Sequence, residues 1–357
     1  MDYTPRIFNR PEGGLLPASP AHGLDPYVFD DGITLAVDVA LATRRPLLVS
    51  GVPGCGKTQL AHAIAAAQGW RLLVETITSR TRLETLTADV DQLRRLNDAQ
   101  VRPPAPAPAA AGGLHPWRAR RALARQGQHG LRPDGCYLEP GIFWWAFDPD
   151  SAARRGLREL DADAYQVREH DPALAPPEPA DPPGTVLLID EIDKAEPDLP
   201  NDLLLPLDRR RFALPAGFFA HRDGRAVKVI AAPAPERSPF LLVITTNGER
   251  ELPQAFVRRC VVLDIEAPNA ARLTRIARAH HPDADPALLE AVIAVLLALR
   301  KEADRQRVRQ PGAAELLDAV HACTQLGIRV DEDKDSVWSY LQRAVLAKDP
   351  ALRREQP

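Results

Sequence analysis

Eight residues between an apolar run and an alanine-rich segment have the types and spacing of a phosphate-binding loop. The segment Gly51-Val52-Pro53-Gly54-Cys55-Gly56-Lys57-Thr58 reads G-x-x-x-x-G-K-T, with a strand pattern before it and a helix pattern after it. In such loops, consecutive backbone N–H groups and a helix N-terminus face the anion, and glycines let the backbone approach it closely. The sequence therefore predicts a nucleotide phosphate site that is formed by Gly51, Pro53, Gly54, Cys55, Gly56, Lys57, Thr58 and Gln59.

Two side chains of this loop have separate expected roles. Lys57 would reach the β- and γ-phosphates, and the hydroxyl of Thr58 would bind Mg²⁺. The cofactors that follow from this chemistry are ATP and Mg²⁺. The alternative is a chance occurrence of the pattern in an ordinary loop.

A second group of candidate residues lies in the segment TVLLIDEIDKA, residues 185–195. Four apolar residues, 186–189, predict a buried strand that ends at Asp190-Glu191. Asp190 is placed to bind Mg²⁺, directly or through water, and Glu191 to position and polarise the attacking water. The alternative is an ordinary strand that ends in acidic residues.

A third group follows in the segment FLLVITTNGERELPQAFVRRCVVLDI, residues 240–265. Asn247 follows a predicted buried strand, and its amide could share the attacking water with Glu191. Arg258 and Arg259 are paired arginines without an adjacent acid, and they could serve as arginine fingers. The alternatives are a turn residue for Asn247 and a solvated surface for the two arginines.

Short apolar runs indicate the strands that must position these residues. Each run is bounded by polar or turn residues, and most are too apolar for a half-exposed strand, which predicts buried parallel strands of an α/β sheet. The runs are residues 47–49, 72–74, 186–189, 241–244 and 261–265. Helical spacing is present from Asp31 to Ala42 and, after about Pro268, at roughly 270–281, 286–303, 312–326 and 335–348. We expect an N-terminal arm over 1–26, a nucleotide-binding domain over 27–267 and an all-α domain over 268–357.

Composition limits the cellular setting and the partners. The chain has 357 residues, of which 45% are hydrophobic and 26% charged, and this length fits about two domains. The formal net charge of −3 predicts no general attraction to nucleic acid or to anionic membranes. Four widely spaced cysteines, an N-terminus without a signal-peptide pattern and the lack of a long apolar run predict a cytoplasmic protein without membrane insertion.

Two proline-rich stretches, 101–113 and 171–184, delimit a predicted Pro/Arg-rich insert at about 98–184. Their composition favours extended, unpacked chain. Between them, residues 115–133 contain five arginines and no acidic residue. This segment could be a solvated face, a contact with an acidic subunit surface or, as the less favoured alternative, a nucleic-acid site.

The phosphate loop, the acidic strand end, Asn247 and the paired arginines form four motifs, which in this order and followed by a helical lid resemble those of AAA+ ATPases. The segments PLLVSGVPGCGKT, LLIDEIDKAEPDLPNDLLLPLD and ITTNGERELPQAFVRRC resemble the MoxR branch, and the resemblance covers roughly residues 27–330 without the insert. It implies a five-stranded parallel sheet flanked by helices, a small all-α lid and nucleotide at the domain boundary. It also implies that Asn247 is sensor 1, that Arg259 is the finger with Arg258 as the competing choice, and that subunits form a hexameric ring.

The same resemblance implies a chaperone-like ATPase that remodels or activates a protein client, often one with a von Willebrand A domain. Alternatives are a nucleotide-gated switch with slow hydrolysis and a DNA-associated AAA+ motor. Residues 134–151 resemble a segment facing the ring interior, so Tyr137, Ile142, Phe143 and Trp144 either touch a partner or pack in the core. The sensor 2 arginine of the family is missing where Pro311-Gly312-Ala313-Ala314 stands, and Arg309 lies just upstream.

Overall fold

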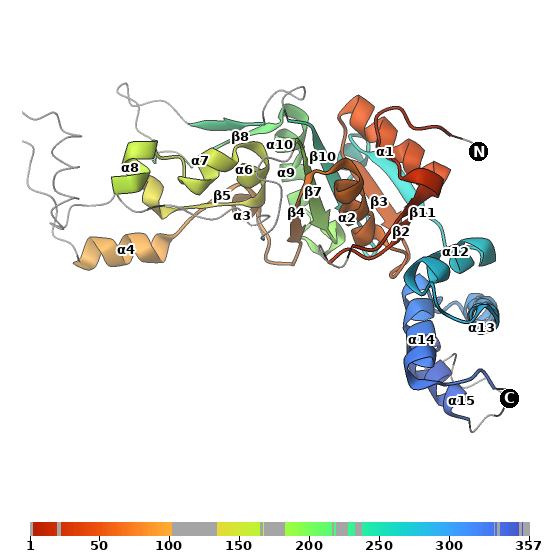
Figure 1. Ribbon diagram of the computed structural model, residues 1–357. Coiled ribbons are helices and arrows are strands. Elements are labelled where there is room, and N and C mark those ends of the chain that lie inside the picture. The colour runs from red at the N-terminus through yellow and green to blue at the C-terminus, as the bar shows by residue number, and fades with distance from the viewer. Residues whose placement is uncertain are drawn as a thin grey trace, which may run out of the picture.

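A five-stranded parallel sheet forms the centre of the molecule (Figure 1). The computed structural model describes residues 3–19, 23–101, 134–164, 167, 183–215, 218, 228–232, 238–331, 333, 336–349 and 352. The strand order is β11-β3-β10-β7-β4, and all neighbouring pairs are parallel. The strands are β3 (Leu47–Gly51), β4 (Arg71–Thr76), β7 (Thr185–Asp190), β10 (Phe240–Thr245) and β11 (Val261–Ile265).

Both faces of this sheet are covered, which explains why its strands are almost continuously apolar. Successive side chains of a strand point to opposite faces, so Leu47 and Val49 pack in one core and Leu48 in the other. The first core includes α1 (Asp31–Thr43) and α2 (Lys57–Gln68). The second includes α3 (Leu83–Thr87), α6 (Ile142–Phe147), α9 (Leu199–Asp202) and α11 (Gln254–Val257). The five predicted strands and the predicted α/β class are confirmed.

Small elements extend the sheet domain on the side of β4 (Figure 1). The short strands β5 (Ala88–Val90) and β6 (Leu138–Pro140) pair antiparallel, as do β8 (Arg211–Ala213) and β9 (Val229–Ala231). The helices of this region are α4 (Gln92–Val101), α7 (Pro149–Ala153), α8 (Glu159–Ala164) and α10 (Leu204–Arg209). Two 3-10 turns, η4 (Asp134–Tyr137) and η5 (Ile192–Lys194), precede β6 and follow β7, respectively.

The aromatic segment at 134–151 belongs to the core of the protomer. Tyr137, Phe143 and Trp144 are almost fully buried, and Ile142 is buried as well. The indole N–H of Trp144 donates a hydrogen bond to Ser151 Oγ at 3.3 Å. The sequence analysis left open whether these side chains touch a partner or pack in the core. In the structure they pack in the core.

The N-terminal arm packs along α1. Its elements are η1 (Glu12–Gly14) and β1 (Leu15–Leu16), which pairs with β2 (Tyr27–Val28), and Phe8 is buried in the core beneath α1. The carboxylate of Asp38 accepts hydrogen bonds from the Tyr3 hydroxyl and from the backbone N–H groups of residues 6–8. Burial alone would raise the pKa of Asp38, but these hydrogen bonds outweigh it, and the pKa is lowered. The arm is thereby fixed to the sheet domain.

The chain after β11 folds into a small helical lid with its own core, as predicted (Figure 1). The lid consists of α12 (Ala270–His280), α13 (Pro286–Gln306), α14 (Ala313–Leu326), α15 (Val337–Leu341) and a π-helical turn, η6 (Gln342–Leu346). Asn269 begins α12 by accepting a hydrogen bond from the backbone N–H of Arg272. Buried Leu296, Leu316 and Trp338 join the helices.

Some predictions fall on parts of the chain outside the described residues. These are nearly all of the proline-rich stretches at 101–113 and 171–184 and the whole arginine-rich segment at 115–133. Within the predicted insert, residues 134–153 are described and packed against the sheet domain. Among the helices of the described part, none is long and apolar enough to cross a membrane.

Candidate functional site

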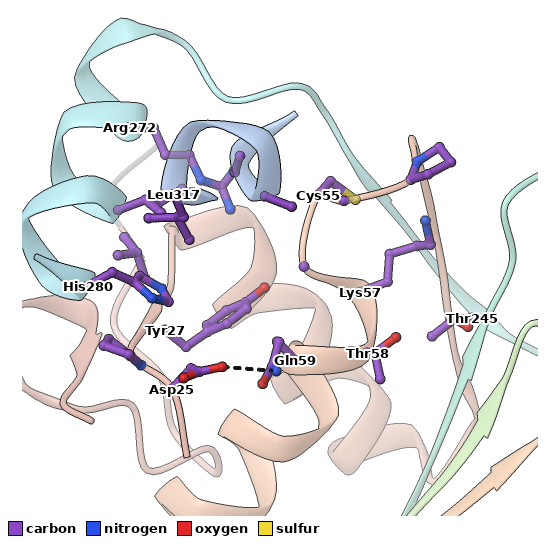
Figure 2. Close-up of a pocket in the computed structure, with 18 of the residues that line it drawn as sticks. Asp25, Tyr27, Cys55, Lys57, Thr58, Gln59, Thr245, Arg272, His280 and Leu317 are labelled. Carbon is purple, nitrogen blue, oxygen red and sulfur yellow. Dashed lines mark hydrogen bonds between the residues drawn. The ribbon is translucent and has the colours of Figure 1, made fainter. Parts of the chain in front are cut away.

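A cavity of about 390 Å³ opens at the carboxyl ends of the central strands, between the sheet domain and the lid. Its wall is formed by the segment before α1, the loop between β3 and α2, the ends of β7 and β10, and the lid helices (Figure 2). A volume of this size suits a small-molecule ligand. Crevices outside the carboxyl ends of parallel strands are the usual ligand sites of α/β sheets.

The predicted phosphate loop forms one wall of this cavity, from Pro53 to Gln59. Gly56 has φ +92°, a conformation that favours glycine, and α2 begins at the next residue. Gly51 ends β3 with φ +148°, and a Cβ atom there would lie 2.7 Å from the carbonyl oxygen of Ile265. Gly51 does not line the cavity. The other predicted residues of the loop, Pro53 to Gln59, all line it.

Lys57 is buried at the N-terminus of α2. Its Nζ donates to the carbonyl oxygens of Gly51 at 2.7 Å and Val52 at 3.2 Å. These two carbonyls hold the ammonium group within the loop, beside the backbone that would face an anion. Burial raises the pKa of the neighbouring Cys55 thiol, which argues against a reactive thiolate at this position.

Thr58 and Asp190 come together although they are 132 residues apart in the sequence. The Thr58 hydroxyl lies 3.0 Å and 3.2 Å from the two carboxylate oxygens of Asp190. Hydroxyl and carboxylate oxygens are ligands that Mg²⁺ prefers, and this ion is often held by only one or two carboxylates together with substrate phosphates. Among the described residues, no group of three or more His, Cys, Asp or Glu side chains could hold a metal ion.

Glu191 follows β7 in the left-handed backbone conformation, with φ +59° and ψ +50°. This conformation costs a residue with a side chain roughly 1–2 kcal/mol, so other contacts must maintain it. The backbone N–H of Glu191 donates to Thr245 Oγ1 at 2.9 Å. Its carboxylate forms an ion pair with Lys194 through one oxygen and lies 3.4 Å from Asn247 Nδ2 through the other.

Hydrogen bonds from backbone N–H groups after β10 to a side chain after β7 also join the ends of these two strands. Buried Asp193 accepts hydrogen bonds through Oδ2 from the backbone N–H groups of Asn247, at 3.1 Å, and Glu249, at 3.0 Å. Since the register places Ile244 beside Ile189, these two strand ends are direct neighbours in the sheet. The structure thus brings together Asp190, Glu191 and Asn247, as the sequence analysis expects.

The wall opposite the phosphate loop contains residues that sequence analysis does not identify. Asp25 and Tyr27 come from the segment before α1, while Arg272, His280 and Leu317 come from the lid (Figure 2). The buried Tyr27 hydroxyl and Arg272 Nε have no hydrogen-bond partner in the described part of the chain. Burial lowers the pKa of His280. The charged side chains of this wall are Asp25 and Arg272, and Arg272 is paired with Asp30 at 2.6 Å.

Neither predicted finger arginine lines this cavity. Arg259 Nε forms an ion pair with Asp208 Oδ2 at 2.7 Å, and its side chain is 40% exposed. Arg258 is exposed on the same short segment after α11. Arg45 donates to the backbone carbonyl oxygens of both arginines, which fixes this segment against the end of α1.

Arg309 also lies away from the cavity, because it pairs with the buried Glu315 at 3.2 Å. Glu315 in turn caps α14 by accepting from the Gly312 N–H at 2.9 Å. The start of α14 packs directly on the phosphate loop, and a Cβ atom on Gly54 would lie 3.4 Å from Ala314 Cβ. Small residues at this point let the lid approach the loop, and Arg309 is not among the described residues that line the cavity.

Comparison with known proteins agrees with this arrangement. A family model, AAA domain (dynein-related subfamily), matches residues 46–260, more than half of the chain. No curated protein matches the chain. A search of solved structures matches a "putative ATPase" from Cytophaga hutchinsonii ATCC 33406, with 12% identity and a TM-score of 0.35 over 81% of this chain and 66% of that one. Another is domain III of the replication initiation protein DnaA from Thermotoga maritima, with 15% identity and a TM-score of 0.38 over 90% of this chain and 95% of that one. The chain belongs to the AAA domain family, in its dynein-related subfamily.

Proposed function

We propose that this protein is a ring-forming ATPase that binds and hydrolyses ATP to remodel or activate a partner protein. The observation that carries the proposal is the meeting of a phosphate loop, a hydroxyl–carboxylate pair and a carboxylate–amide pair in one cavity. A simple binding module needs the loop alone. The additional carboxylate of Glu191 is the group that water activation requires.

In this proposal the residues of the loop, from Pro53 to Gln59, bind the phosphates through backbone N–H groups. Lys57 leaves its two carbonyl partners and neutralises the terminal phosphates. Thr58 and Asp190 hold Mg²⁺, which neutralises charge on the phosphate oxygens when bound. Tyr27, Arg272 and His280 line the part of the cavity that remains for the base and sugar.

Hydrolysis itself is assigned to Glu191 and Asn247. Glu191 accepts a proton from the attacking water, and the Asn247 amide orients that water beside the carboxylate. The 3.4 Å separation of Asn247 Nδ2 and Glu191 Oε1 supports a shared function. The ion pair with Lys194 must loosen when the carboxylate acts as a base, because a cationic partner stabilises the ionised form.

The ring and the client rest on the resemblance to the MoxR branch. Arg259, or Arg258 in its place, would act on nucleotide bound to the neighbouring subunit, and a hexamer is the proposed assembly. The client is a protein, in this branch often one with a von Willebrand A domain, and a nucleic-acid partner is not favoured at a net charge of −3. A cytoplasmic location is part of the same proposal.

The test is steady-state release of phosphate from Mg·ATP by the full chain, together with calorimetric binding of Mg·ATP to the variant Lys57→Ala. We expect turnover by the wild type and loss of tight binding in the variant, because the phosphates lose their main countercharge. Lys301→Ala, an exposed lid lysine away from the cavity, is the matched control and should bind normally. Near wild-type affinity in Lys57→Ala would reject the loop as the nucleotide site, and absence of wild-type turnover would favour a nucleotide-gated switch.

A further inference from the structure

Thr245, the last residue of β10, bonds to both acidic residues at the end of β7. Its side chain is fully buried, and its hydroxyl donates to Asp190 Oδ1. The same hydroxyl oxygen accepts from the backbone N–H of Glu191 at 2.9 Å. One buried hydroxyl therefore contacts the side chain of one acid and the backbone of the next.

The bond to Glu191 matters because of the unusual backbone there. Glu191 has φ +59° without glycine's freedom, and it precedes η5 without a side-chain cap. A residue in this conformation persists only where its surroundings hold it. Loss of the Thr245 oxygen would leave the Glu191 N–H without this acceptor and would allow the backbone to rotate towards a common conformation.

The bond to Asp190 orients the carboxylate that also meets Thr58. Asp190 then has one oxygen fixed by Thr245, while the Thr58 hydroxyl lies 3.0 Å from the other. Groups that hydrogen-bond to a metal-ligating carboxylate orient it, and their removal typically costs about 10–100-fold in activity or metal affinity. Thr245 stands in this relation to the proposed Mg²⁺ ligand.

We infer that Thr245 is a positioning residue for ATP hydrolysis, whose hydroxyl aligns Asp190 and Glu191 at the same time. Thr245 acts through these two acids and does not itself touch the reacting groups. It holds Glu191 where the Glu191 carboxylate lies next to the Asn247 amide. The inference rests on the proposed function, since it concerns the hydrolysis step of that site. Lys57 Nζ donates its two hydrogen bonds to the carbonyl oxygens of Gly51 and Val52, and Thr245 takes part in neither. We therefore expect nucleotide binding to depend little on Thr245.

The test compares two substitutions that separate the hydroxyl from the shape of the side chain. Thr245→Val keeps the branched shape and loses the hydroxyl, while Thr245→Ser keeps the hydroxyl and loses a methyl group. We expect kcat to fall about 10–100-fold in Thr245→Val, with the Kd for Mg·ATP within about fivefold of wild type, and kcat in Thr245→Ser to stay within about threefold. A residue that serves packing alone predicts the reverse order, because serine leaves a cavity and valine does not.

Thr87→Val is the matched control for loss of a buried threonine hydroxyl elsewhere. The Thr87 hydroxyl donates only within α3, to Leu83 at 2.8 Å and Glu84 at 3.5 Å, so kcat should not change. In the background of Glu191→Gln, Thr245→Val should lower kcat by a smaller factor than in the wild type, because the part of its effect that acts through Glu191 is already lost while the part that acts through Asp190 remains. If Thr245→Val does not fold, Thr245→Cys, with a thiol that is a weak donor and acceptor, replaces it and should show the same loss.

The outcomes distinguish this inference from the function on which it rests. Wild-type turnover together with an unchanged kcat in Thr245→Val would overturn the inference and leave the proposed function intact. Greater damage from serine than from valine would also overturn it. Absence of turnover in the wild type would reject the proposed function and the inference together.

Discussion

The two oxygens of the Glu191 carboxylate have different neighbours, and this difference bears on how the residue could act as a base. One oxygen is paired with Lys194, whose pKa is raised by the hydrogen bond to Glu191. The other faces the Asn247 amide. The Lys194 side chain is 43% exposed, so this ion pair is screened by water and is weak enough to open during a reaction cycle.

The first prediction concerns this carboxylate. Glu191→Gln should bind Mg·ATP with wild-type affinity and lower kcat by roughly 10²-fold or more, since general-base catalysis typically contributes 10²–10⁴-fold. Glutamine keeps the size and one oxygen but cannot accept a proton at neutral pH. Phosphate release and calorimetric binding, measured on the same preparation, separate the two effects.

The control for this variant is Glu196→Gln, which removes the charge of an exposed glutamate five residues further along the chain. It should retain full turnover. Normal hydrolysis by Glu191→Gln would show that Glu191 has only a structural part at the end of β7.

At the scale of secondary structure elements, the lid is attached to the sheet domain by a small number of polar contacts. Arg272 Nη1 pairs with Asp30 Oδ2 at 2.6 Å, and Arg275 Nη2 donates to the Gly13 carbonyl at 3.0 Å. Asp30 is also the N-cap of α1, where it accepts from the Ile33 N–H at 2.7 Å. Arg272 therefore joins the first turn of α12, the start of α1 and the cavity wall.

The second prediction is that Arg272→Ala weakens binding of Mg·ATP. The substitution removes a cation from the cavity wall and a lid contact, and loss of one charge-assisted hydrogen bond, about 1.5–3 kcal/mol, corresponds to roughly a tenfold or larger rise in Kd. Arg278→Ala is the matched control, because Arg278 lies on the same helix, is exposed and does not line the cavity. Equal Kd values for the two variants in titration calorimetry would mean that Arg272 serves only the lid contact.

The sequence predicted the elements with strong local patterns and missed those that depend on distant neighbours. The five strands and the lid helices have apolar runs or helical spacing long enough to recognise. Helix α6 has the sequence IFWWAF, which is apolar on every side and has no amphipathic period, so its place in the core was not predictable from periodicity. Strands β5 and β6, of three residues each, are too short to leave a pattern.

The same distinction applies to the candidate site. Motif spacing identified Lys57, Thr58, Asp190 and Glu191 as candidates, because their positions relative to a loop and a strand end are local properties. Arg272 was not predictable, because it reaches the cavity only through the packing of the lid on the sheet domain. The role of Thr245 was not predictable either, because its bonds to both acids depend on the pairing of β10 with β7.

At the scale of the whole molecule, neither candidate finger arginine is among the described residues that line the cavity. Arg258 and Arg259 lie outside the cavity wall, on the segment that joins α11 to β11. Arg259 is held by Asp208 and by the Ala255 carbonyl oxygen at 2.8 Å, while its side chain remains 40% exposed. A partly exposed guanidinium with a fixed direction is suited to reach a neighbouring subunit, and an ATPase that depends on it would need at least two subunits.

The last prediction tests this dependence between subunits. Arg259→Ala should bind Mg·ATP normally and hydrolyse it poorly, since an arginine finger contributes about 10³–10⁵-fold in related phosphoryl-transfer enzymes. Mixing Arg259→Ala with Lys57→Ala should restore part of the activity, because mixed assemblies contain interfaces with an intact phosphate loop from one subunit and an intact Arg259 from the other. Wild-type activity per subunit should also rise with protein concentration as rings assemble.

If Arg258→Ala is inactive and Arg259→Ala is fully active, the finger is the more exposed neighbour, Arg258, and the ring mechanism stands. If both single variants and the double variant hydrolyse ATP at the wild-type rate, and activity per subunit does not depend on concentration, each protomer acts alone and the proposal of hydrolysis at subunit interfaces fails.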